Sequence, residues 1–185
     1  MDVHQALRAR RTVHAYQPAR ALPEGALERA LEAAHLAPNH RFTYPWRFVL
    51  PGPAARGGLA EVAVAEAERK RPLTEEGRAK ARAKALDPSE LVVLCQRLDP
   101  DPGVREEDYA AVSCAAQNLM LSLAGDGVGT KWSTGGLTRA PETYALLGVD
   151  PAAERIVGFI WAGYPSADPA PPARPPLADF VRRIP

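Results

Sequence analysis

Cysteine is scarce in this chain of 185 residues, where only Cys95 and Cys114 occur. Their separation fits neither a redox CxxC motif nor a metal-binding spacing, and both lie in apolar or alanine-rich segments. We therefore expect two buried free thiols. Long hydrophobic runs are also missing. No segment approaches the ~18 apolar residues of a membrane span, and the N-terminal segment lacks the apolar core of a signal peptide, so the expected location is the cytoplasm.

An excess of charge of either sign is missing as well, because 23 basic and 22 acidic residues leave a formal net charge of +1. A protein that follows a nucleic-acid backbone needs a broad basic surface, so nucleic acid is not the expected partner. Any cationic site must be local. The hydrophobic and charged fractions, 46% and 24%, are those of an ordinary globular protein, and we expect one domain over residues 1–185.

Apolar spacing and turn residues predict a mixed order of helices and strands. Expected helices are a short one after a capping box formed by Asp2 and Gln5, and longer ones over residues 23–35, 53–70 and 106–125, with a short one at 141–147. Expected strands cover residues 46–50, 91–98, the segment TKWSTGG and the segment RIVGFIWAGYP. Because helices and strands do not alternate, the pattern favours an α+β fold over a doubly wound sheet.

The helix expected over residues 106–125 carries two faces. One is an apolar stripe made by Val112, Ala116, Leu119, Met120 and Leu123. The other consists of small residues: Ala111, Ala115, Asn118 and Ser122. A helix with both faces usually crosses a core or a subunit interface.

Three stretches could carry chemistry. The first, RARRTVHAY, places Arg10 and Arg11 at the end of the first helix, directly before Thr12. These cations could simply complement the helix dipole while facing water. Alternatively they form a phosphate clamp, because a guanidinium fork binds phosphate oxygens bidentately and keeps its charge.

The second stretch, LAPNHRFTYPWRFVL, is a proline-bracketed loop containing His40. No other histidine, cysteine or carboxylate is spaced to complete a metal site with it, so no metal is expected, and Trp46 is expected in the core. The third stretch, GVGTKWSTGG, lets the backbone approach a ligand closely. It contains no GxGxxG fingerprint, and Ser133 has no GxSxG elbow, so neither a Rossmann site nor a hydrolase triad is expected.

Taken together, these segments resemble the nitroreductase family. The matching pattern is RRTVHAY, then the APNH…PWRF loop and strand, then the alanine-rich helix that leads into TKWSTGGL, then RIVGFIWAGYP. The segments occur in the family's order over nearly the whole chain, and the PWxF and KWSTGGL details are similar to the short bacterial NAD(P)H nitroreductases. The resemblance implies an intertwined homodimer with a nitroreductase-like α+β fold, in which helices flank a mainly antiparallel sheet.

The resemblance also implies a function. Family members bind FMN at the subunit interface and use NADH or NADPH to reduce nitroaromatics, quinones or related acceptors by ping-pong hydride transfer through the flavin N5. Carried over, Arg10, Arg11 and Thr12 match the residues that hold the FMN phosphate and pyrimidine edge. The remaining matches are Leu36 and His40, delivered by the other subunit, and Trp132, Ser133 and Thr134, which lie along the isoalloxazine.

On this basis no protein residue acts as nucleophile or acid–base catalyst. We expect Arg10 or Arg11 to supply a positive field, and an amide within residues 133–135 to face N5. Ser133 and Leu36 stand where the subgroup often has Arg, and Tyr44 replaces a commoner Gln, which predicts a reshaped substrate side.

The charged segment at about residues 70–88 is expected to be a mobile lid over the site. Alternatives are a same-fold enzyme for reductive dehalogenation or dehydrogenation, a flavin carrier without turnover, and a nucleic-acid-binding helical protein, which the charge balance disfavours.

Overall fold

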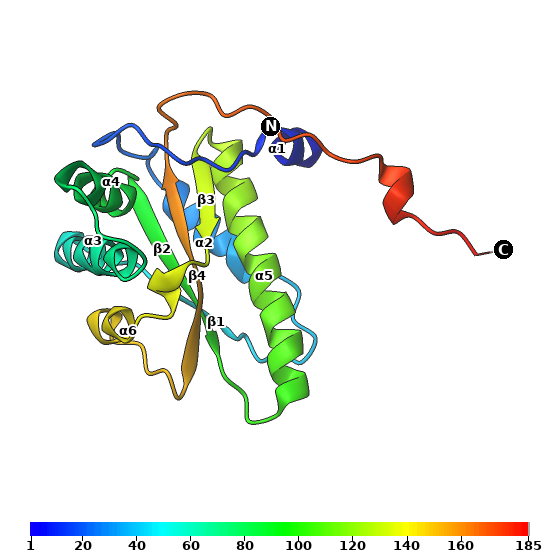
Figure 1. Cartoon of the computed structure of the whole chain (residues 1–185). Helices are drawn as coiled ribbons and strands as arrows, with labels where there is room; N and C mark the ends of the chain where they lie inside the picture. The colour runs from blue at the N-terminus through cyan, green and yellow to red at the C-terminus, as the bar shows by residue number, and fades with distance from the viewer. Residues whose placement is uncertain (185) are drawn as a thin grey trace.

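The computed structural model describes residues 1–184, and in it a single antiparallel sheet is covered by helices on both faces (Figure 1). The strands are β1 (Trp46–Val49), β2 (Glu90–Arg97), β3 (Gly129–Ser133) and β4 (Glu154–Gly163), in the spatial order β1-β2-β4-β3. All neighbouring pairs are antiparallel. The predicted α+β class is thereby confirmed. None of the described helices is long and apolar enough to span a membrane.

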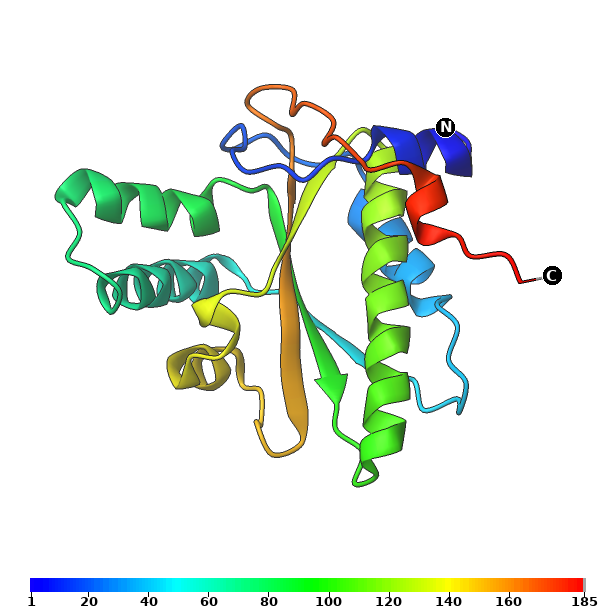
Figure 2. The same cartoon turned by 45° about the vertical axis from the view of Figure 1, so that its right-hand side comes forward.

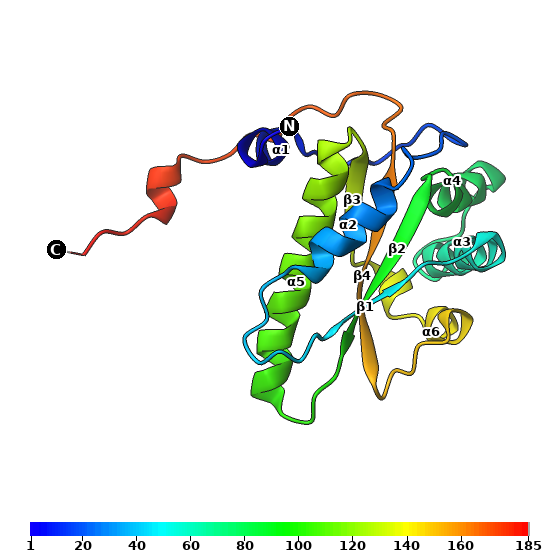
Figure 3. The same ribbon diagram turned by 180° about the vertical axis from the view of Figure 1, so that it is seen from behind.

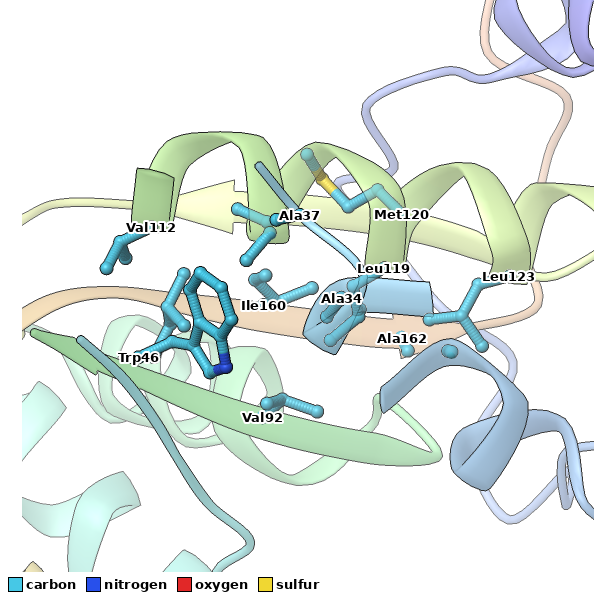
Figure 4. Packing of buried hydrophobic residues seen from close by; sticks show 14 of the residues in the cluster. Ala34, Ala37, Trp46, Val92, Val112, Leu119, Met120, Leu123, Ile160 and Ala162 are labelled. Carbon is cyan, nitrogen blue, oxygen red and sulfur yellow. The ribbon is translucent and has the colours of Figure 1, made fainter. Parts of the chain in front are cut away.

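Helices α2 (Ala26–His35) and α5 (Pro102–Gly125) cover one face of the sheet, as seen from behind in Figure 3. The predicted apolar stripe of α5 faces the sheet, where Leu119 packs near Ile160 and Trp46 (Figure 4). The predicted small face packs on α2, because Ala111 and Ala115 are buried and the Asn118 side chain donates a hydrogen bond to the carbonyl of Ala33. Within one chain, therefore, both faces of α5 serve the core.

Helices α3 (Pro53–Glu68), α4 (Glu75–Leu86) and α6 (Pro141–Leu147) lie on the opposite face of the sheet (Figure 1). Leu59, Ala60 and Ala85 pack there against β2 and β4. The only buried residues of α4 are the small side chains Ala81 and Ala85. Its charged surface is tied to α3 by two ion pairs, Arg78–Glu68 at 2.8 Å and Arg82–Glu61 at 2.7 Å.

The two ends of the chain lie outside these layers. After α1 (Val3–Ala9), the chain runs beside the outer strand β3, and the amide of Val13 donates to the carbonyl of Thr130 at 3.0 Å. After β4, the chain leaves the body as an extended arm (Figure 1) that carries a short turn at Leu177–Phe180, drawn in red in Figure 2. The arm from residue 171 to residue 184 is exposed throughout.

Most predicted elements are present, with corrected boundaries. The capping box of Asp2 and Gln5 is confirmed. Helix α2 begins at Ala26 rather than Pro23, because Gly25 adopts a left-handed conformation that ends the preceding turn. Helix α5 begins at Pro102, because Asp101 caps it through the amide of Gly103. The prediction for Cys114 was wrong: it lies on the outer side of α5 and is exposed, whereas Cys95 is buried.

Candidate functional site

A cavity of about 920 Å³ opens between the α3–α4 pair and the β3–β4 end of the sheet. Its floor includes Phe159 and Trp161 of β4. Three of the predicted site residues line it, namely Trp132, Ser133 and Thr134. The N-terminal segment contributes His14 and Tyr16, which brings it into contact with the same space. The volume lies near the upper end of the ~300–1,000 Å³ range of small-molecule sites, enough for a large planar ligand.

The wall built by β3 depends on a close contact with β4. Side chains alternate along a strand, so the Trp132 ring packs on the α2/α5 side, while Lys131 and Ser133 face the cavity side. The indole covers the backbone of Gly158, where an added Cβ would lie 2.0 Å from the Trp132 Nε1. That buried nitrogen has no hydrogen-bond partner within residues 1–184. A glycine at position 158 is therefore what allows Trp132 to sit where it does.

The loop after β3 presents free backbone donors. Among the described residues, none accepts a hydrogen bond from the amide of Thr134 or Gly135, and the space beside the Gly135 Cα is open. The chain then turns through Gly136–Thr138, where a Cβ on Gly136 would lie 2.3 Å from the Glu66 carboxylate. Unpaired amides at a glycine-rich turn are suited to donate to an acceptor atom of a ligand.

The cavity is strongly cationic, a feature that the motif-based analysis missed. The chain has only four lysines, and all four line this cavity: Lys70, Lys80, Lys84 and Lys131. Arg71 is the one arginine in the lining, and Glu66, the one carboxylate, pairs with Arg69. Burial and then the charge of Lys84 lower the pKa of Lys131, the least exposed of the four. Counting lysines against the far commoner arginines would have flagged these positions.

Arg10, Arg11 and Thr12 lie beside the outer edge of β3, next to the cavity but not in its lining. The Arg11 guanidinium donates to the carbonyls of Arg8 and Arg10, the latter at 3.0 Å, so it caps the end of α1. In the described part of the chain, no group accepts a hydrogen bond from the Arg10 side chain, which is half-buried. Arg11 thus serves the end of α1, as in the first of the two alternatives for this segment, whereas Arg10 is available to a ligand.

Leu36 and His40 are not brought to this cavity. They lie on the α5 side of the sheet, where Glu107 of α5 pairs with Arg41 at 2.7 Å and contacts His40 Nδ1 at 3.2 Å. From Glu107 to the end of α5 at Gly125 is about 27 Å at 1.5 Å per residue, and α1, which ends directly before Arg10, lies beside that far end (Figure 1). The predicted site residues therefore form two separate groups within one chain.

The loop that carries His40 is well anchored yet leaves apolar surface exposed. The Asn39 carboxamide oxygen accepts hydrogen bonds from the Tyr44 amide at 2.8 Å and from the Thr43 hydroxyl at 3.3 Å. Leu36 and Phe42, however, are 81% and 75% exposed. Within residues 1–184, no group of three or more His, Cys, Asp or Glu side chains could hold a metal ion.

Comparison with known proteins gives one consistent family. The family model described as the nitroreductase family matches residues 7–164. A Bacillus subtilis protein, YfhC, named as an NAD(P)H nitroreductase, is 30% identical over 94% of this chain and 89% of its own length. The crystal structure of a nitroreductase-like family protein from Bacillus cereus has a TM-score of 0.82, at 29% identity, and covers 100% of this chain and 96% of that one.

A nitroreductase from Exiguobacterium sibiricum, solved in complex with FMN, has a TM-score of 0.80 at 16% identity, with coverage of 100% and 98%. At this identity the likeness shows the fold alone. The predicted nitroreductase-like fold is confirmed by these two structures.

Proposed function

The chain belongs to the nitroreductase family, and on that premise we propose that it is an FMN-dependent oxidoreductase that works as a homodimer. Its electron donor is NADH or NADPH, and its acceptors are nitroaromatics, quinones or related compounds. The observation that carries the proposal is the cationic cavity with unpaired amides at the loop after β3. The FMN in the Exiguobacterium sibiricum relative and the name of the Bacillus subtilis relative support it.

The residues of the cavity fit an anionic, planar cofactor. Bound FMN would supply the hydride-transfer chemistry between the nicotinamide and the acceptor. Thr134 or Gly135 would donate its free amide to the cofactor ring, and Arg10 with Thr12 would hold the phosphate at the β3 edge. Lys84 and Lys131 line the cavity, whereas Arg10 does not, and they would supply the positive field that favours an anionic ring.

Two copies of the chain explain why the predicted residues fall into two groups. A symmetric pair can deliver Leu36 and His40 of one copy to the Arg10 and Trp132 side of the other, which a single chain cannot do. The exposed C-terminal arm supports this arrangement. Leu177 and Phe180 on the arm are 76% and 72% exposed, and apolar side chains on an arm that leaves the body are suited to bind a second copy.

The lid over residues 70–88 stays a prediction. Only Ala81 and Ala85 of α4 are buried, so the outer end of this helix is held to α3 mainly by exposed ion pairs, which contribute about 0–1 kcal/mol each. A segment held in this way can open at low cost to admit a substrate. Exchange of amide hydrogens should therefore be faster in residues 75–80 than in α3 residues 59–64.

The proposal is tested by the colour of the purified protein and its response to reductant. We expect a yellow dimer with about one FMN per chain, whose flavin absorbance bleaches on anaerobic addition of NADH or NADPH and returns with a nitroaromatic or a quinone. A colourless protein that does not take up FMN added in excess contradicts the proposal. A bound flavin that neither nicotinamide reduces leaves a carrier rather than an enzyme.

A further inference from the structure

The four lysines of the cavity come from three places in the fold, namely β3, α4 and the connection between α3 and α4. On α4, Lys80 and Lys84 are one turn apart and face the same side as Gly77 and the buried Ala81. Lys131 on β3 is the least exposed of the four lysines, and the charge of the nearby Lys84 contributes to lowering its pKa. Lys70 and Arg71 lie in the connection from α3 to α4, beyond the N-terminal end of α4. The cations therefore extend from Lys131 on β3 to the exposed Lys70, Arg71 and Lys80 around the α3–α4 connection, a group that is called the mouth of the cavity below.

Most cations of the cavity form no ion pair with a carboxylate of the described chain. No ion pair within residues 1–184 involves Lys70, Arg71, Lys84 or Lys131, and Lys80 pairs only with Glu76, at 2.6 Å on the exposed surface of α4. By contrast, Arg78 and Arg82, on the same helix but outside the cavity, are both paired with carboxylates of α3. The same helix thus pairs its outward cations with carboxylates of α3, whereas Lys80 pairs only within α4 and Lys84 has no ion-pair partner among the described residues.

The choice of lysine over arginine is informative, because arginine is the usual basic residue of this chain. A guanidinium fork binds phosphate bidentately and suits a resident cofactor, which is the role proposed for Arg10. An ammonium binds as a flexible point charge. The mouth carries two ammonium groups and one guanidinium, that of Arg71, and exposed cations on flexible side chains suit an anion that must enter and leave in every turnover.

We propose that Lys70, Arg71 and Lys80 bind the 2′-phosphate of the hydride donor, so that the protein prefers NADPH to NADH. This inference rests on the proposed function of the same cavity. A phosphomonoester carries about −1.5 to −2 charge at pH 7, whereas the corresponding hydroxyl of NADH is neutral. Both donors share the anionic pyrophosphate, so cations can discriminate between them only where they meet the 2′-phosphate.

The test compares two matched double variants. Arg71→Gln/Lys80→Gln removes two cations from the cavity mouth, and Arg78→Gln/Arg82→Gln removes two from the outward side of the same helix pair. In the wild-type holoprotein we expect kcat/KM for NADPH to exceed that for NADH by roughly tenfold, because the 2′-phosphate would be held by a few partly exposed ionic contacts, each of which contributes little. The mouth variant should bring the ratio close to one by raising the KM for NADPH, and the control variant should keep it.

A binding measurement separates this inference from the proposed function. By calorimetry, adenosine 2′,5′-bisphosphate should bind the wild type and the control variant more tightly than 5′-AMP does, and this difference should vanish in the mouth variant and at high salt. Equal kcat/KM for both donors in the wild type, or an unchanged ratio in the mouth variant, overturns the inference. If neither donor reduces the flavin, the proposed function fails, and the calorimetric comparison alone decides whether the 2′-phosphate is bound. If the mouth variant raises the KM only for anionic acceptors, the cations bind the acceptor rather than the 2′-phosphate, and the inference is also overturned.

Discussion

Gly158→Ala is a small change whose effect on the site can be worked out from the structure. Gly158 lies in β4, and its missing side chain is replaced by the Trp132 indole. An alanine Cβ would lie 2.0 Å from Nε1, 2.5 Å from Cδ1 and 3.1 Å from the carbonyl oxygen of Ser133. Ordinary contacts between such atoms are about 3.5 Å or longer, so the ring must move by roughly 1.5 Å.

This displacement has two expected consequences. Overpacking of this kind costs about 1–3 kcal/mol, which for a chain of this size lowers the melting temperature by roughly 2–12 °C. Because Trp132 leads directly into the loop with the free amides, flavin occupancy should fall together with stability. Thermal unfolding followed by circular dichroism measures the first effect, and the ratio of flavin to protein absorbance measures the second.

Gly57→Ala provides the matched control. Gly57 lies in helix α3, and a Cβ there would meet nothing within 4 Å. Alanine is favoured over glycine inside a helix by about 0.5–1 kcal/mol, so this variant should melt at or slightly above the wild-type temperature. If Gly158→Ala unfolds at the same temperature as Gly57→Ala and keeps its flavin, the described packing of Trp132 on β4 is incorrect.

Three further outcomes are expected. Arg10→Ala should lower flavin content, whereas Ser133→Ala keeps its amide and should change little; equal flavin in the wild type and Arg10→Ala would refute the first role. Arg56→Ala should destabilise the fold by about 2–4 kcal/mol in denaturant titrations, because the half-buried guanidinium donates to several carbonyls at the end of α4, including that of Ala85 at 3.0 Å. Burial raises the pKa of the Cys95 thiol to about 12 in the folded protein, compared with about 9 in the unfolded chain. The buried neutral thiol therefore contributes to stability below pH 9, and this contribution is lost as the pH rises further. Stability should decline as the pH rises above about 9, less so in Cys95→Ala, and a flat melting temperature from pH 8 to pH 11 would contradict this.

The elements of the fold could be predicted because their signals are local. The capping box of α1 and the apolar stripe of α5 are set by residues a few positions apart, and the structure contains both. Errors arose where a local signal was overridden. Pro23 suits a first helical turn, but the left-handed Gly25 starts the helix later, and the outward position of Cys114 depends on which side of α5 meets the sheet and α2.

The site was harder to predict, because it depends on which distant segments meet. Motifs identified the Arg10 segment and the loop near Ser133, and the structure brings both to the same edge of the sheet. The cationic wall was not predicted. The segment around Lys80 and Lys84 has the pattern of a solvated helix, and only its packing on α3 turns these lysines toward Lys131.

The central claim is that each flavin site is built from two chains, and complementation tests it most directly. Arg10→Ala and His40→Ala, each expected to bind FMN poorly alone, are unfolded together, refolded with FMN, and compared with each parent treated in the same way. In a mixed dimer, one site carries both lesions and the other carries neither, so flavin content and NAD(P)H-dependent bleaching should exceed those of both parents. Flavin content no higher than that of the parents, in a sample shown to contain mixed dimers, would contradict the shared site.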